Sequence, residues 1–422
     1  MVSSMPISGL KWVNRVIKQI RALALAVFLL LVVLSPAQLQ AQSELVIIES
    51  SASAQFPTSI GFSLAAESDD DIIDIRLHYT VEREAFAEVT SEVYIEFDPG
   101  TSVDVSWSLD LRRVGGLPLG TVVDYWWTVA DAGGNQVATA PAQIRLDDNR
   151  YDWRSITEGD IIIYWYEGDE SFAQELMTTA QAALERLAED TGAHLKEAVG
   201  LYIYASTQDL QGSMIFPQEW TGGVAFTRYG TIAIGVAPYN LEWGKRAVVH
   251  ELTHLVTHQM TFNPYGGLPT WLNEGLSMHA EGELEVIYQV YLIQAVAQGS
   301  LISVQSLASP FSAFPEQSYL SYAQSYSIVE FLIDEYGQES MLELLNTFQQ
   351  GSSYDGALLK VYGFDMDGLN ARWRDSLAAP APAEPIEWQI SPALIGLLAA
   401  MATLLALGLA ILAEDWAWRR GR

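Results

Sequence analysis

Short runs in which apolar and polar residues alternate dominate the first third of the chain. Clear examples are residues 72–79, 93–97 and 122–129, and turn signals such as Asp98-Pro-Gly100 and Asp131-Ala-Gly-Gly separate them. Alternation with a period of two places every second side chain on one face of a β-strand. Several such strands within about 100 residues predict a β-sandwich over residues 43–147.

The periodicity changes after Tyr151, where strand patterns begin to alternate with helical ones. The predicted elements are strands at 161–166 and 201–204, a helix at 171–189, a glycine-turned hairpin at 222–235, and helices at 283–297, 322–335 and 338–349. Strands followed by a long helical stretch indicate the α+β class for residues 148–378. The chain therefore predicts two folded domains of different kinds.

One predicted helix carries a candidate for metal chemistry. In the stretch Ala247–Val256, apolar residues recur at helical spacing and predict one buried face. His250 and His254 lie one turn apart on another face, so both imidazoles can reach one zinc ion. Glu251 lies beside them, and its carboxylate can hold and deprotonate a water whose pKa the metal lowers to about 7. The pattern predicts a Zn²⁺ site with Glu251 as general base.

The identity of the third ligand decides the class of zinc site. A metzincin would carry a glycine and a third histidine soon after the motif, but Thr257 and Met260 occupy those places. In the gluzincin arrangement, a glutamate from a second helix completes the site. Pro269 and Thr270 predict the start of such a helix, and Glu274 is expected in its first turn. Glu274 is the predicted third ligand.

The pairing of His250-Glu-Leu-Thr-His254 with Trp271-Leu-Asn-Glu-Gly275 resembles the gluzincin peptidases of the thermolysin and M1-aminopeptidase type. It most resembles the membrane-associated bacterial peptidase MA-like group, over about residues 160–376. The resemblance implies a thermolysin-like domain that hydrolyses a peptide or protein substrate. His279 is the alternative third ligand, while His258 is expected at the helix end or beside the ligands.

The resemblance also implies an oxyanion donor. Tyr322-Ala-Gln-Ser-Tyr326 is similar to the gluzincin segment whose first tyrosine donates a hydrogen bond to the tetrahedral oxyanion. Tyr322 is therefore the implied donor and Tyr326 the second choice, whereas plain aromatic packing is the alternative for both. The family's aspartate four residues after the ligand glutamate is replaced by Met278, so another group, such as Glu281 or a backbone carbonyl, must orient a ligand histidine.

The same likeness favours endopeptidase action. M1 aminopeptidases carry a glutamate that grips a free α-amine, and residues 222–226 contain none. The edge strand at this place in gluzincins pairs with extended substrate through backbone groups, which can bind many sequences.

The charge and cysteine content of the chain limit the classes of partner and of chemistry that it can use. The net charge is −30, with 22 basic residues against 52 acidic ones, and this balance argues against a nucleic-acid partner, which needs clustered lysine and arginine. Cysteine is absent, which excludes disulfides, thiolate zinc sites and cysteine nucleophiles. The oligomeric state stays open.

Both ends of the chain carry membrane-type patterns. Basic residues precede an uncharged apolar run at 22–34, which predicts a signal peptide over residues 1–41. Residues 390–413 carry no charge and are long enough to cross a hydrocarbon core of about 30 Å, so they predict a transmembrane helix. A Pro/Ala-rich linker at 379–389 precedes it and a basic tail at 414–422 follows. The basic side stays in the cytoplasm, which predicts a single-pass cell-membrane protein with its catalytic domain outside.

The predicted function is thus a membrane-anchored, extracytoplasmic zinc metallopeptidase. The alternative is a surface binding or adhesion protein with a degenerate peptidase-like domain, and a third hypothesis is a purely structural metal site. Glu251 favours the enzyme, because a scaffold has no need of a base beside the ligands. The run Tyr125–Asn135 resembles the late strand and turn of Ig-like or fibronectin-III modules, and it leaves the sandwich as a spacer or a binding module.

Overall fold

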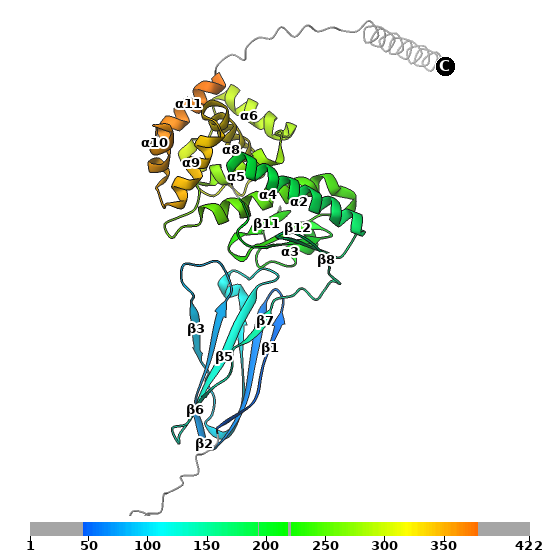
Figure 1. Cartoon of the computed structure of the whole chain (residues 1–422), viewed down its shortest axis with the longest axis vertical. Coiled ribbons are helices and arrows are strands. Elements are labelled where there is room, and N and C mark those ends of the chain that lie inside the picture. The colour runs from blue at the N-terminus through cyan, green and yellow to red at the C-terminus, as the bar shows by residue number, and fades with distance from the viewer. Residues whose placement is uncertain (1–44, 193, 218–220, 379–422) are drawn as a thin grey trace, which may run out of the picture. The chain divides into compact units, whose positions relative to one another are not determined.

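The computed structural model describes residues 45–378, except residue 193 and residues 218–220. These residues form two compact units, the first ending at Gly266 and the second beginning at Gly267. Every described strand belongs to the first unit, and the second unit is helical (Figure 1). The described chain is therefore a mixed α+β protein with a strand-rich N-terminal region and a helical C-terminal part.

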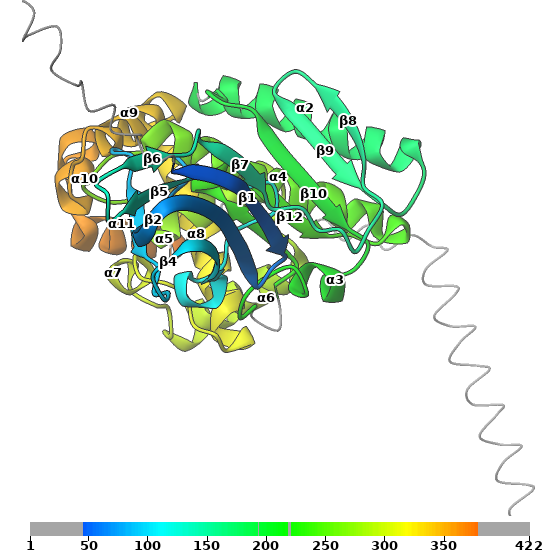
Figure 2. The same ribbon diagram turned by 90° about the horizontal axis from the view of Figure 1, so that it is seen from below.

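The strand-rich region is a seven-stranded sheet arranged around one long strand. Its strands are β1 (Val46–Gln55), β2 (Ser59–Val81), β3 (Thr90–Tyr94), β4 (Gly100–Asp110), β5 (Val122–Asp131), β6 (Gln136–Ala138) and β7 (Ala142–Arg145). The first half of β2 pairs with β1 and β4, and its second half pairs with β3 and β5. The pairing with β4 is irregular between Glu67 and Ile72, where β2 changes partners. Figure 2 shows how strongly β2 curves.

Alternating burial along the strands explains why these residues form a sheet with one face in the hydrophobic core. Buried and partly exposed side chains alternate along the first half of β2 and all of β5. Ile60, Phe62 and Trp127 are fully buried in the shared core. The predicted strands at 72–79 and 122–129 are confirmed as parts of β2 and β5, while the Ig-like character of the region stays a prediction.

The rest of the first unit is built on a five-stranded mixed sheet. In spatial order its strands are β11 (Gly223–Phe226), β12 (Thr231–Gly235), β10 (Val199–Tyr204), β9 (Ile161–Trp165) and β8 (Arg154–Glu158). β9, β10 and β12 are parallel, whereas β11 runs antiparallel to β12 at the edge. The crossover from β9 to β10 contains helix α2 (Glu170–Thr191), whose first turn is capped by the Asp169 side chain accepting from Phe172 N. The predicted hairpin is confirmed.

Helix α4 (Leu241–Thr261) packs against α2, the edge strand β11 and its neighbour β12. Asn240 occupies its N-cap position, but its side chain makes no capping hydrogen bond. The helix therefore owes its position to packing, and this packing brings the predicted metal helix to the β11 edge of the sheet.

The second unit is a group of helices around a central one. The helices are α5 (Thr270–Glu281), α6 (Val286–Gln298), α7 (Val304–Leu307), α8 (Pro315–Tyr336), α9 (Gln338–Gln349), α10 (Tyr354–Tyr362) and α11 (Met366–Ala378). α8 contacts α5, α6, α9 and α11. The predicted helix at 338–349 is confirmed with its bounds. α8 begins at Pro315 rather than Tyr322, because proline at the first helical position supports a start there.

The predicted location in a cell membrane requires correction. In the described part of the chain, no helix is both long and apolar enough to cross a membrane. α6 is the most apolar candidate, but its 13 residues span only about 20 Å, and α8 has 22 residues with several acidic side chains among them. This finding overturns the predicted single-pass anchor with an outward catalytic domain and a cytoplasmic C-terminus. The segments 1–41, 379–389, 390–413 and 414–422 lie outside the described residues.

Candidate metal site

Helix α4 buries one side and leaves the predicted site residues at the surface of the other. Val248, Leu252 and Leu255 are completely buried, whereas His250, Glu251 and His254 are half-buried. Three buried threonines are satisfied within the helix, because their hydroxyls donate to carbonyl oxygens one turn earlier. They are Thr253, Thr257 and Thr261, with distances of 2.8, 2.8 and 2.7 Å. The apolar spacing thus holds the two imidazoles on the accessible face.

The two histidines have the geometry of a shared ligand pair. Their Nε2 atoms lie 3.1 Å apart, and their rings are nearly perpendicular at 86°. Two nitrogens bound to one tetrahedral zinc at about 2.0–2.1 Å would be separated by about 3.3 Å. The observed separation is close to this value, so the pair fits a metal ion between the two nitrogens.

Glu274 completes the group. One ligand atom from each of His250, His254 and Glu274 lies within 4.8 Å of the other two. Within residues 45–378, apart from the undescribed gaps, no other set of three such side chains could hold a metal ion. Glu274 is the fifth residue of α5, so it lies just beyond the first turn in which it was expected. The donor set of two imidazoles and one carboxylate suits zinc.

The alternative ligands have other partners. His279 Nδ1 contacts the Glu330 carboxylate of α8, and this hydrogen bond holds the pKa of Glu330 below its usual range. His258 lies at the end of α4, where its Nε2 is 3.2 Å from a Glu84 oxygen at an angle unsuited to a hydrogen bond. Burial lowers the pKa of His258 and raises that of Glu84. Neither histidine belongs to the three-residue group.

Gly275 lies beside the ligand Glu274 at a close crossing of α5 and α8. A Cβ atom at this position would overlap the Ser325 carbonyl oxygen and lie 2.6 Å from Val329 Cγ2. The two helices can approach this closely only because residue 275 has no side chain. The glycine of the Trp-Leu-Asn-Glu-Gly motif therefore has a packing role that sets the position of α5.

Gly223 lies against the carboxylate of Glu251. A Cβ atom here would be 2.7 Å from Glu251 Oε1 and 3.2 Å from its Cγ. Gly222 is similarly close to the ring of Trp243, at 3.0 Å. The start of the edge strand β11 therefore approaches the candidate general base with its bare backbone.

The two predicted oxyanion donors lie in different surroundings on α8. Burial raises the pKa of Tyr326, and a hydrogen bond to Glu330 raises it further. The ring of Tyr322 lies edge-on to Phe311, with centroids 5.2 Å apart, and 6.4 Å from Tyr288. Both assignments stay predictions.

The contact between the loop after β2 and the end of α4 was not predicted from the sequence. Phe86 stacks on Phe262 with ring centroids 4.2 Å apart and 9° between the planes. Arg228 Nε donates to the Glu84 carbonyl at 3.1 Å, and Glu84 N donates to the Arg228 carbonyl at 2.7 Å. An exposed phenylalanine in a polar loop is the one signal that could have revealed this contact.

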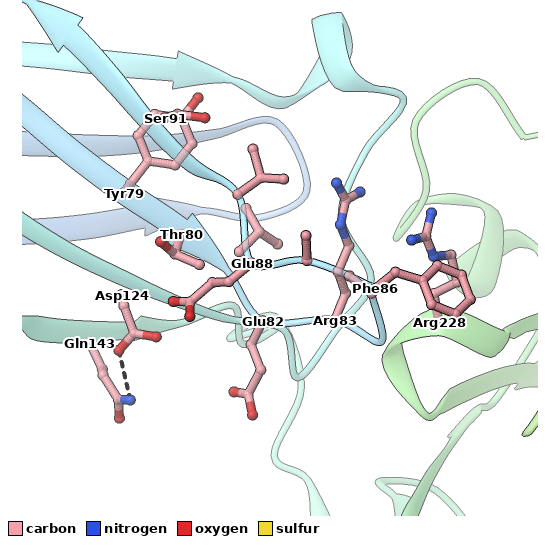
Figure 3. Close-up of a pocket in the computed structure, with 14 residues that line it drawn as sticks. Tyr79, Thr80, Glu82, Arg83, Phe86, Glu88, Ser91, Asp124, Gln143 and Arg228 are labelled. Carbon is pink, nitrogen blue, oxygen red and sulfur yellow. Dashed lines mark hydrogen bonds between the residues drawn. The ribbon is translucent and has the colours of Figure 1, made fainter. Parts of the chain in front are cut away.

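Residues of the same loop line an open cavity of about 500 Å³, shown in Figure 3. Phe86 and Arg228 lie at one end, and Asp124 lies at the other, where Gln143 Nε2 donates to it at 2.9 Å. Side chains of both charges line the space, so the lining favours no single class of ligand.

Residues 179–379 match the family model of the Peptidase MA superfamily. The matched segment is just under half of the chain and contains α4 and α5. It supports a peptidase MA-like family and, with it, a hydrolase of the peptidase type. Members of this superfamily are usually zinc-dependent, and the group of His250, His254 and Glu274 could bind such a metal.

Similar solved structures share little sequence with this chain. OgpA from Akkermansia muciniphila is 13% identical over 26% of this chain and 30% of its own length, with a TM-score of 0.20. A β-1,3-glucan binding domain of carbohydrate-binding module family 56 is 16% identical over 24% of this chain and 99% of its own, with a TM-score of 0.15. The putative ApaA protein from Bordetella pertussis is 9% identical over 26% of this chain and 96% of its own length, with a TM-score of 0.19. No curated protein matches.

Gly275→Ala should damage the metal site through packing. The added methyl group meets backbone of α8 rather than a flexible side chain, so α5 must shift at a cost of about 1–3 kcal/mol. We expect a lower urea midpoint and weaker zinc binding in competition with a chelator. Gly267→Ala is the matched control, because a Cβ there meets no atom within 4 Å. Equal stability and zinc affinity in both variants would contradict the packing role.

Proposed function

We propose that this chain is a zinc peptidase in which His250, His254 and Glu274 hold the metal and Glu251 is the general base. The observation that carries the proposal is the approach of the three ligand atoms to within 4.8 Å of one another. Two further features support it: Glu251 lies between the two ligands on α4, and the Peptidase MA superfamily model matches this part of the chain.

The chemistry follows from the residue types. When bound, zinc would polarise the scissile carbonyl and lower the pKa of water to about 7. Glu251 takes a proton from the attacking water and passes it to the nitrogen of the leaving amine. Its carboxylate is half-buried and close to the backbone of Gly223, which limits the orientations it can adopt. The chain thus supplies a carboxylate base whose orientation is restricted.

Strand β11 is the proposed binding surface for substrate. Its outer edge has no partner strand among the described residues, and its first residue contacts Glu251. An extended peptide can add to such an edge through backbone hydrogen bonds, which places the scissile bond near the base. No acidic side chain occurs in Gly223–Phe226 to hold a free α-amine, so an internal peptide bond is the proposed substrate.

Tyr322 is the proposed donor to the carbonyl oxygen that gains negative charge. Tyr326 is the second candidate, one helical turn later on α8, and its hydroxyl forms a hydrogen bond with Glu330. A donor of this kind acts in the transition state and therefore affects kcat more than KM.

The metal proposal is tested by comparing Glu274→Ala with Glu251→Gln in the full chain. Elemental analysis should find one zinc per chain in the parent and in Glu251→Gln, and much less in Glu274→Ala. Glu251→Gln should lose turnover of a casein or peptide-library substrate, because an amide has no basicity. Full zinc retention in Glu274→Ala would move the third ligand to His279 or elsewhere, and an active Glu251→Gln would exclude Glu251 as the base.

Tyr322→Phe should lower kcat by about 10²–10³-fold with little change in KM, since the lost hydroxyl stabilises the transition state. Tyr326→Phe is the matched control one helical turn away, and steady-state kinetics on one peptide compares the two. A large loss of kcat in Tyr326→Phe alone would place the donor at that residue instead.

Gly223→Ala should separate activity from stability. Its methyl group meets the far end of the Glu251 side chain, which can turn away at little cost in folding free energy but then leaves its catalytic orientation. We expect unchanged thermal stability and zinc content with kcat/KM lower by about tenfold or more. Gly266→Ala, where a Cβ meets no atom within 4 Å, should keep full activity. Parent-like turnover in Gly223→Ala would contradict a fixed role for the β11 backbone.

A further inference from the structure

Helix α6 exposes an apolar stripe that nothing in the described structure covers. Its residues are Val286, Ile287, Val290, Ile293 and Val296, with exposed fractions of 72, 46, 50, 66 and 36%. Their spacing puts them on one side of the helix, while Ala295 is buried and the helix packs on α8. These five residues are called the α6 face below.

The sequence that contains the α6 face and follows it is also uncharged. Residues 286–315 contain no acidic residue, lysine, arginine or histidine, although the whole chain carries 52 acidic and 22 basic side chains. Single exposed apolar residues are ordinary, but a contiguous apolar stripe on a helix without charges indicates a contact surface. The occupant should therefore be an apolar segment without charges of its own.

The chain leaves the described structure close to this helix. α11 ends at Ala378, and one turn earlier Arg374 Nη2 donates to the carbonyl oxygens of Leu301 at 2.8 Å and Ile302 at 3.3 Å. Leu301 and Ile302 are the third and fourth residues after the C-terminal end of α6. The last described helix, α11, therefore contacts the loop that follows α6.

We propose that the uncharged segment 390–413 of the same chain packs on the α6 face. The linker 379–389 can span up to about 35 Å when extended, whereas α6 is only about 20 Å long, so the segment can reach the whole face. Tethering raises its effective concentration to about the millimolar range. A second copy of the chain at micromolar concentration competes poorly with such a tether. This inference does not depend on the proposed peptidase activity.

The absence of cysteine allows a direct test by cross-linking of the purified full-length chain. The pair Ile293→Cys with Leu404→Cys should form an intramolecular disulfide on mild oxidation. We expect a monomer on a non-reducing gel and the cross-linked peptide in mass spectrometry. The matched control pair, Glu339→Cys with Leu404→Cys, puts the first cysteine on exposed α9 and should cross-link at least tenfold less. Ile293 and Glu339 are both exposed, so substitution of either by cysteine should not prevent folding.

Two results would overturn the proposal. Covalent dimers joined through Ile293→Cys in two copies would assign the face to self-association, and equal yields in the two pairs would show that the segment does not dock. A charge on the face gives a second measurement. Adding Ile293→Glu to the pair Val290→Cys with Leu404→Cys should lower its cross-link at least fivefold, and an unchanged yield would also count against docking.

Discussion

Burial of one side of α4 is the constraint on which the candidate site depends. Val248, Leu252 and Leu255 are buried on the side of α4 that packs on α2 and the sheet. The helical spacing then places His250 and His254 on another side of the helix. The buried hydroxyls of Thr253 and Thr257 donate hydrogen bonds to carbonyl oxygens of the same helix, so they are compatible with burial on this side. The apolar packing of α4 therefore sets the side of the helix on which the two histidines lie.

Two glycines next to the site show that backbone as well as side chains shapes it. Gly223 brings a strand to the Glu251 carboxylate, and Gly275 brings α8 to the helix that carries Glu274. Each occurs beside a residue with a proposed chemical role. Backbone is stiffer than a long side chain, so a site bounded by it changes shape less when the surrounding side chains move.

Local patterns predicted the elements of the site well. The helix with its two histidines, the hairpin before it and the helix at 338–349 all have periodicities that sequence alone displays, and the structure confirms them. Contacts between distant segments leave no such pattern. The stacking of Phe86 on Phe262, the partner change along β2 and the role of Gly275 each depend on where two remote segments meet. The predicted membrane location was wrong. It had been inferred from the composition of the two ends of the chain and not from the described fold.

The contact between Phe86 and Phe262 bears on how this protein can be divided. A strand-rich region in front of an enzyme is usually regarded as a cassette that evolution can add, remove or exchange freely. Here Phe86 of its β2–β3 loop stacks on Phe262, the residue just after α4, and Glu84 forms two hydrogen bonds with Arg228, one between backbone groups and one from the Arg228 side chain. Exchange of the region would uncover the end of that helix, so the two parts must be inherited together or change together.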